Sequence, residues 1–402
     1  MSSAILHEAL RPILLRDEAI TGDASRTRAL YRVATCINSM AISGGSELNA
    51  VRTAEQLKAR GHDVEVMTLT DVHDGMYERY ADAGIAVHGF GVDSLVGRQA
   101  LRQVRALSRA FRQGRFDIVH TNDSYTNFLM VAAARLAGIP ALASKRWIQP
   151  MFSQHRYTDA IAFRLAHGVL ANSVAVGRTA QRIEGVAAER VHVVPNFVDD
   201  QLFAVRAERP QWRAQYGFAE EHVVFCIVAQ LRAEKNHVLL LRAFAGALQA
   251  NPQVRLLVVG DGPERAHVAD VIEDLGVSSQ VTMTGHLDRA WRTFAAADVA
   301  VLPSQHEGFP NSVVEAMAVG IPVIGTNVGG IPDAITDQQS GLLVEPNSLP
   351  ALKRALLRMA GDAAFRHVSG LRAQRFAEAH HTADAVLDSL ERVYATVTGA
   401  RR

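Results

Sequence analysis

Short apolar runs alternate with helical stretches along nearly the whole chain, and this alternation restricts the fold. Seven such runs precede residue 200, at 31–40, 62–69, 85–90, 116–122, 140–145, 168–172 and 191–195. Six more follow, at 222–230, 254–260, 280–284, 299–303, 323–326 and 342–345. Strands that alternate with helices form parallel sheets covered by helices on both faces. The sequence therefore predicts an α/β protein with two doubly wound parallel sheets that face a central cleft.

The length of the chain indicates two domains. A single core rarely grows beyond about 250–300 residues, and this chain has 402. We expect an N-terminal extension over 1–28, a Rossmann-like domain over 29–198 and a second Rossmann-like domain over 199–381. Helical stretches are expected over 349–375 and 382–397, and the last helix, 382–402, is expected to complete the first domain. The charged, irregular segment 200–218 is interpreted as the linker.

The composition is that of an ordinary globular protein, with 48% hydrophobic and 21% charged residues. The net charge of +1 gives no reason to expect a nucleic-acid partner. Cys36 and Cys226 lie in apolar runs, where a thiol behaves as a small hydrophobe, and so few cysteines fit a reducing compartment. No leader opens the chain, and no apolar run approaches the ~20 residues that span a bilayer. We therefore expect a cytoplasmic protein, with peripheral contact with the inner face of the cell membrane left open.

Two stretches of the first half are basic. The stretch 97–115 places Arg98, Arg102, Arg105, Arg109 and Arg112 at spacings of three or four among apolar residues. Amphipathic basic helices of this kind lie on anionic membranes; the alternative is a solvated helix whose apolar face packs on the sheet. The second stretch, 145–164, mixes basic and aromatic residues without a clear period, which indicates a binding loop.

Two carboxylates flank one predicted strand-to-helix corner in the second half. Glu307 follows the apolar run 299–302, and Glu315 comes after seven intervening residues, on a helix that begins near Asn311 or Ser312. Ligands of open α/β sheets bind at such corners, because freed backbone N–H groups and the helix dipole converge there. The alternative is a capping box, in which Glu315 folds back on the backbone amide of Ser312 for local reasons.

A loop with two cations precedes another helix of the second half. Arg232 and Lys235 stand before the helix expected from about His237, where the helix dipole favours an anion. Together they can neutralise a diphosphate without a metal ion; the alternative is a solvated loop in which Glu234 pairs with one of them. The nearby Gly260-Asp261-Gly262 lacks the third glycine of a dinucleotide fingerprint, because Arg265 stands in its place. No HxxxH, CxxC or DxD pattern indicates a metal site.

Two features of the first half also fall at ends of predicted strands. Gly44 and Gly45 follow the first strand, in a loop that either approaches a phosphate or is a plain turn. His120 and Asn122 lie where the fourth strand should end. That position faces ligands in such a sheet, although a lone histidine is more often a structural residue.

Taken together, these motifs resemble the retaining glycosyltransferases of the GT-B fold, family 4. The marks are the pair Glu307 and Glu315, the pair Arg232 and Lys235, the Pro195-Asn196 turn and Gly260-Asp261-Gly262-Pro263, in the expected order. The resemblance implies that Glu315 holds the ribose of a nucleotide sugar, that Arg232 and Lys235 hold its diphosphate, and that Glu307 contacts the sugar. It further implies donor contacts from Gly45, Gly308, Phe309, Pro310, Asn311 and Ser312, and an acceptor side with His120 and Asn122. Many relatives have a histidine where this chain has Asn122.

The same resemblance implies the chemistry. A hexose or N-acetylhexosamine would pass from a donor, more often UDP-linked in this family, to a lipid-linked, lipopolysaccharide or other envelope glycan acceptor. The front-face substitution needs neither metal nor cofactor, since the nucleotide sugar is a co-substrate and the departing diphosphate takes the acceptor proton. Two alternatives stay open: a nucleotide-sugar epimerase or hydrolase of the same fold, and a noncatalytic membrane-associated adaptor that uses the arginine-rich helix.

Overall fold

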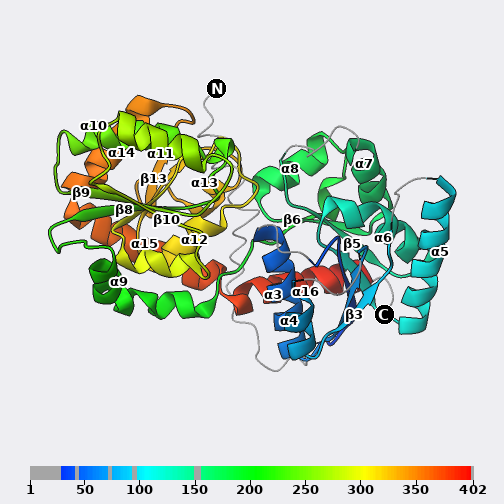
Figure 1. The fold of residues 1–402 in the computed structure, drawn as a ribbon. Coiled ribbons are helices and arrows are strands. Elements are labelled where there is room, and N and C mark those ends of the chain that lie inside the picture. The colour runs from blue at the N-terminus through cyan, green and yellow to red at the C-terminus, as the bar shows by residue number, and fades with distance from the viewer. Residues whose placement is uncertain (1–28, 41–44, 71–74, 93–96, 149–154, 400–402) are drawn as a thin grey trace.

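Two separate parallel sheets carry the structure, a computed structural model that describes residues 29–40, 45–70, 75–92, 97–148 and 155–399. Figure 1 shows them side by side, each covered by helices. We call them the first and second sheet. All thirteen predicted strands are present, each within three residues of its expected ends. The predicted extension 1–28 lies outside the described residues.

The first sheet has seven strands in the order β3-β2-β1-β4-β5-β6-β7. They are β1 (Arg32–Ile37), β2 (Asp63–Thr68), β3 (Ala86–Gly89), β4 (Ile118–Thr121), β5 (Ala141–Lys145), β6 (Gly168–Ala171) and β7 (Val191–Val193). One face packs on α3 (Gly45–Ala59), α4 (Tyr77–Asp82) and α16 (Ala383–Thr398). The other face packs on α5 (Gly97–Gly114), α6 (Ser124–Ala137), α7 (His155–Leu165) and α8 (Val174–Arg182).

The second sheet has six strands in the order β10-β9-β8-β11-β12-β13. They are β8 (Val223–Val228), β9 (Val254–Val259), β10 (Val281–Gly285), β11 (Val299–Leu302), β12 (Val323–Thr326) and β13 (Gly341–Val344). One face packs on α10 (His237–Leu248), α11 (Arg265–Asp274) and α14 (Leu349–Gly361). The other packs on η2 (Asp200–Glu208), η4 (Ala290–Ala296), α12 (Asn311–Ala318), α13 (Ile331–Ala334) and α15 (Ala363–His380).

The chain returns to the first sheet at its end, so it passes between the sheets twice. On α16, Leu387 and Tyr394 are fully buried in the core beneath α3, and Arg60, directly after α3, forms an ion pair of 2.8 Å with Asp388. The two passages are tied together: Val198 N–H donates to the His381 carbonyl oxygen over 2.9 Å, and His381 Nδ1 donates to the Asn196 carbonyl oxygen over 3.0 Å. The exact limits of the two domains stay a prediction.

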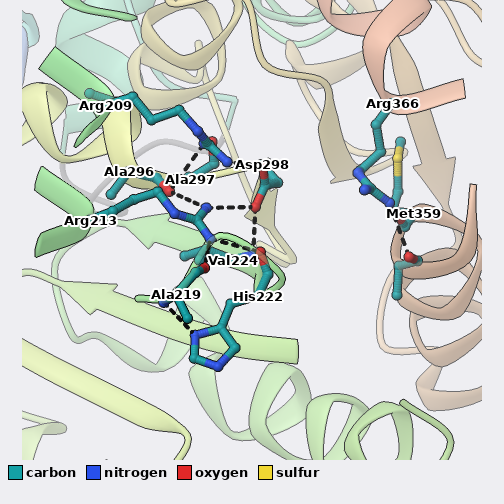
Figure 2. A network of polar contacts seen from close by, with 12 residues as sticks. Arg209, Arg213, Ala219, His222, Val224, Ala296, Ala297, Asp298, Met359 and Arg366 are labelled. Carbon is teal, nitrogen blue, oxygen red and sulfur yellow. Dashed lines mark hydrogen bonds and ion pairs between the residues drawn. The ribbon is translucent and has the colours of Figure 1, made fainter. Parts of the chain in front are cut away.

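The interpretation of 200–218 as an irregular linker was wrong. The segment forms η2 and α9 (Arg209–Gln215), and Leu202 is buried in the core of the second sheet. Figure 2 shows how Arg209 and Arg213 donate to Asp298, at 2.7 and 3.2 Å, just before β11. Because Leu202 packs in this core and these arginines bind Asp298, the segment belongs to the second half.

Two further expectations need correction. The helix expected over 349–375 is two helices, because Asp362 ends α14 and accepts a hydrogen bond from Phe365 N–H as the cap of α15. The stretch 145–164 is not a loop throughout: Lys145 belongs to β5 and pairs with buried Glu184 at 2.9 Å, and α7 begins at His155. Residues 149–154 of that stretch lie outside the described residues. Among the described helices, none is long and apolar enough to cross a membrane.

Candidate functional site

The predicted site residues follow strands that lie beside the topological switch point of each sheet, where the order of the strands reverses. In the second sheet this point lies between β8 and β11, which are neighbours although β9 follows β8 in the chain. Arg232 and Lys235 follow β8, and Glu307 follows β11. In the first sheet the point lies between β1 and β4, which lead to Gly45 and Asn122. Ligands of such sheets bind at these switch points.

Lys235 and Glu307 are in contact across the switch point of the second sheet. Lys235 Nζ lies 2.5 Å from Glu307 Oε1, and Ser304 Oγ donates to the same oxygen over 2.7 Å. Glu307 is buried, whereas the Lys235 side chain is 23% exposed. Lys235 therefore pairs with the acid 72 residues away and not with Glu234, as the solvated-loop alternative required.

Arg232 stands at the start of the short 3-10 turn Ala233–Lys235, and its carbonyl accepts from Lys235 N–H over 3.0 Å. Its side chain is exposed and makes no hydrogen bond or ion pair with the described part of the chain. A guanidinium without a carboxylate partner, one turn from a lysine and before the N-terminus of α10, is free to bind an anion.

Glu315 is not part of a capping box. Helix α12 begins at Asn311 after Pro310, and no side chain caps it. The carboxyl of Glu315 lies on the second turn, partly buried, where burial raises its pKa above the usual value. The charge of Arg52, on α3 below the first sheet, lowers that pKa and the charge of Asp199 raises it. Glu315 thus lies within electrostatic range of Arg52, a residue of the other half of the molecule.

The loop between the two glutamates is held by the first half of the molecule. A Cβ added to Gly308 would overlap the backbone carbonyl oxygen of Arg146, so only glycine permits this approach. Phe309 is buried, with its ring 5.7 Å from that of His381. Ser312 is partly buried on the first turn of α12. The geometry of this loop therefore depends on how the two halves fit together.

The first residues of α3 and α12 meet at the boundary between the halves. A Cβ built on Gly45 would lie 2.7 Å from Nδ2 of Asn311, so the absence of a side chain leaves room for that amide. Helix N-termini carry unsatisfied N–H groups and positive dipole charge. Two of them directed to one place favour the oxygens of a phosphorylated ligand.

His120 and Asn122 are both buried and hydrogen-bonded. His120 Nδ1 lies 2.8 Å from Tyr394 Oη and its Nε2 lies 3.3 Å from Ser144 Oγ. Burial, together with the charge of Arg146, lowers the pKa of His120 to about 3, so the imidazole is neutral. Asn122 Nδ2 donates to Thr35 Oγ1 over 3.0 Å. Their role on the acceptor side stays a prediction.

Sequence reasoning did not single out Arg146 as a site residue, and it used Asn196 only as a family mark. Arg146 follows β5 and donates to Oδ1 of Asn196 over 3.2 Å, while Asn196 Nδ2 donates to Oδ1 of Asn311 over 2.7 Å. A basic residue directly after a strand was the available signal for Arg146. No local pattern indicates that it reaches position 196.

Two parallel doubly wound sheets whose switch points lie on either side of one boundary define the GT-B class of protein. The comparisons agree. The model of the Glycosyltransferase Family 4 matches residues 43–202, and that of the Glycosyl transferases group 1 matches residues 208–376. The chain belongs to this family, and it is accordingly a retaining glycosyltransferase.

Individual relatives are distant. The chain is 32% identical over 282 residues to 2-deoxystreptamine glucosyltransferase of Streptomyces kanamyceticus, covering 65% of this chain and 73% of that protein. It is 23% identical over 373 residues to N-acetyl-alpha-D-glucosaminyl L-malate synthase of Bacillus anthracis, covering 90% and 95%. The crystal structure of Anabaena HepE in complex with UDP superposes with a TM-score of 0.79 at 22% identity, covering 91% of this chain and 100% of that chain.

Proposed function

We propose that this protein transfers a hexose or N-acetylhexosamine from a UDP-linked donor to a lipid-linked, lipopolysaccharide or other envelope glycan acceptor, with retention of the anomeric configuration. The contact between Lys235 and Glu307 carries the proposal. It sets one cation, which would bind a diphosphate, beside one carboxylate, which would bind a sugar. Arg232 adds a second, unpaired cation one turn away.

The residues present suit a reaction whose main demand is to stabilise a leaving diphosphate. The acceptor oxygen bonds to the anomeric carbon on the face from which the diphosphate departs, the bond from that carbon to the phosphate oxygen breaks, and the acceptor proton passes to the phosphate. Lys235 and Arg232 would stabilise the charge that develops there. Glu307 would hold a sugar hydroxyl after exchanging its contact with Lys235 for the donor, and Glu315 would hold the ribose.

The relatives support the donor class. The structures of Anabaena HepE were obtained with UDP and with UDP-glucose. A lipopolysaccharide outer core galactosyltransferase, WaaB, superposes with a TM-score of 0.73 at 19% identity. Their names support a UDP-linked donor and an envelope acceptor, and our proposal for this chain extends no further than those classes.

Thermal unfolding in the presence of nucleotide sugars tests the donor. A ligand that binds only the native state raises the melting temperature, so we expect UDP-glucose, UDP-galactose or a UDP-N-acetylhexosamine to raise it, and GDP-mannose not to. Release of UDP is then measured with and without envelope glycans, in the presence of EDTA. Release that needs no acceptor would favour the epimerase or hydrolase, and absence of any nucleotide binding would favour the adaptor.

The helices on one face of the first sheet support peripheral contact with an anionic membrane. Within α5, α6, α7 and α8 the sequence contains ten arginines and a single acid, Asp159, which is buried. The side chains of Arg102, Arg105 and Arg109 on α5 are exposed. We call the outer surface of these four helices the arginine face; Figure 1 shows α5 on the side of the first half that is farthest from the second sheet.

Apolar side chains lie among these arginines. Leu101 on α5 and Leu136 on α6 are 51% and 50% exposed. On α7, Tyr157 and Ile161, one turn apart, are 75% and 47% exposed. The apolar side of α5 meanwhile packs on the sheet through Leu107 and Phe111, as the alternative of a solvated helix expected. Exposed apolar groups among cations suit the interface of an anionic bilayer.

Sedimentation with lipid vesicles tests this part of the proposal. We expect the protein to bind vesicles that contain phosphatidylglycerol and not vesicles of phosphatidylcholine alone, with binding lost at high salt. The Arg102→Glu, Arg109→Glu variant should lose binding. Its matched control is Arg372→Glu, Arg375→Glu, which changes two exposed arginines of α15. Equal binding by both variants would refute a role for the arginine face.

A further inference from the structure

Arg146 has an unusual environment for a partly buried cation. Its guanidinium donates to the carbonyl oxygen of Asn122 over 3.0 Å, to Oδ1 of Asn122 over 3.4 Å and to Oδ1 of Asn196 over 3.2 Å. These acceptors are all neutral amide oxygens. Burial lowers its pKa to about 10, so the side chain remains charged at neutral pH. The charges of Asp123 and Glu47 raise that pKa, but the groups to which the guanidinium donates are neutral, which suggests that the position does more than stabilise the fold.

The arginine fixes the orientation of the amide of Asn196. A guanidinium has N–H donors and no acceptor, so the atom of Asn196 that faces it must be Oδ1. The Nδ2 group of Asn196 is therefore directed away from Arg146. It donates to Oδ1 of Asn311 over 2.7 Å, across the boundary between the two halves.

The same constraint passes to Asn311. Since its Oδ1 accepts from Asn196, its Nδ2 must face the opposite way. That atom is the nearest neighbour of the place that a Cβ of Gly45 would occupy, at 2.7 Å. The amide N–H groups of Asn311 thus lie between the N-termini of α3 and α12, at the loop that begins with Glu307.

We propose that Arg146 is a positioning residue that acts through Asn196, and that it makes Asn311 present hydrogen-bond donors to hydroxyl oxygens of the donor sugar. The inference rests on the proposed function, because it assumes a sugar donor bound at the Glu307 loop. The orientation of the Asn311 amide would then depend on the other half of the molecule, because it is fixed only while Asn196 is within hydrogen-bond distance. An open molecule would present an amide of either orientation to the sugar.

We call the series of hydrogen bonds from Arg146 through Asn196 to Asn311 the relay. The Asn196→Asp variant tests the relay without removing a side chain. Aspartate accepts from Arg146 but has no donor for Asn311, so the amide of Asn311 must turn and direct Oδ1 towards Gly45. Calorimetry with UDP and with UDP-glucose separates the two parts of the donor. We expect the affinity for UDP to change by less than twofold and that for UDP-glucose to fall tenfold or more, with a matching rise of KM for the donor and no fall of the melting temperature.

A second pair of variants changes the arginine itself. Arg146→Lys keeps a side chain that only donates and should retain most of the difference in affinity between UDP-glucose and UDP. Arg146→Met donates nothing and should lose that difference. Affinities for UDP-glucose equal to those of the unaltered protein in Asn196→Asp and Arg146→Met would overturn the relay, and so would an equal loss for UDP and UDP-glucose.

Failure of the relay and failure of the proposed function give different results. If the unaltered protein binds neither UDP nor UDP-glucose, the proposed donor is wrong. The relay is still tested by NMR on protein labelled with ¹⁵N, where the side-chain NH₂ group of Asn311 should show a nuclear Overhauser effect to the Hα atoms of Gly45. The effect should disappear in Asn196→Asp, and its absence in the unaltered protein, or its persistence in the variant, would overturn the relay.

Discussion

Replacement of both Arg232 and Lys235 by alanine should separate catalysis from stability. Because the Arg232 side chain is exposed and makes no hydrogen bond or ion pair with the described residues, its loss should change the free energy of unfolding by at most about 0.5 kcal/mol. Loss of Lys235 leaves Glu307 with Ser304 as its hydrogen-bond donor. Breaking a buried ion pair lowers the free energy of unfolding by about 3–5 kcal/mol, and breaking an exposed ion pair lowers it by less than about 1 kcal/mol. For a lysine that is 23% exposed we therefore expect about 1–2 kcal/mol.

The effect of the double variant on turnover should be much larger. Removal of one preorganised group that stabilises developing charge lowers kcat by about 10²–10³, or about 2.7–4 kcal/mol. The effects of removing several residues that act on one leaving group are not additive. We therefore expect the double variant to lose about 10³–10⁴ in kcat, or about 4–5.5 kcal/mol, which exceeds the expected loss of about 1–2.5 kcal/mol in the free energy of unfolding.

Release of UDP and unfolding in urea measure the two quantities on the same preparations. Lys353→Ala, which removes a lysine from α14, is the control for loss of one positive charge. The reasoning is refuted if the double variant keeps more than a tenth of the kcat, or if it is already unfolded at the temperature of the assay.

Three further perturbations test other parts of the structure. Gly308→Ala should cost about 1–3 kcal/mol and lower kcat more than tenfold, because its methyl group meets the Arg146 carbonyl oxygen; an unchanged urea midpoint and kcat would contradict the close approach. Asp298→Ala should cost about 3–5 kcal/mol in urea unfolding, because it leaves buried Arg213 without its carboxylate; a loss below 1 kcal/mol would contradict this. The native pKa of His120, about 3, lies below the unfolded value near 6.5, so only the unfolded state takes up this proton and stability falls as the pH falls from 6.5 towards 3. Between pH 7 and pH 5, the free energy of unfolding of His120→Gln should therefore fall by about 2 kcal/mol less than that of the unaltered protein, as measured by urea unfolding. An equal fall in both proteins would refute the assignment of a neutral, buried His120.

The strands were predictable because each is a continuous apolar run, typical of strands buried on both faces. The candidate site residues could be recognised because they follow the carboxyl ends of these strands, where ligands of open α/β sheets bind. The contact between Lys235 and Glu307 could not be predicted from local pattern, since 72 residues separate them. The sequence placed both beside one ligand, but it did not predict that they touch.

The errors have physical causes. Segment 200–218 was read as a linker because its many charged residues mask two buried positions, Leu202 and Val205. Its arginines bind backbone carbonyls and Asp298 more than 80 residues away, which no local pattern indicates. The break at Asp362 was signalled by Gly361 followed by a capping residue, and it could have been found. The relay through Asn196 depends on the fit between the halves, which the sequence does not encode locally.

The return of α16 to the first sheet has a consequence for biosynthesis. The core under α3 includes Leu387, Leu390 and Tyr394 from the last sixteen residues of described helix. A nascent chain that has left the ribosome up to residue 198 therefore has every strand of the first sheet but not the side chains that fill this layer. The second sheet can fold before α16 has been synthesised, whereas the first must wait for α16. A truncation that removes α16 should leave the first half, not the adjacent second half, dependent on chaperones.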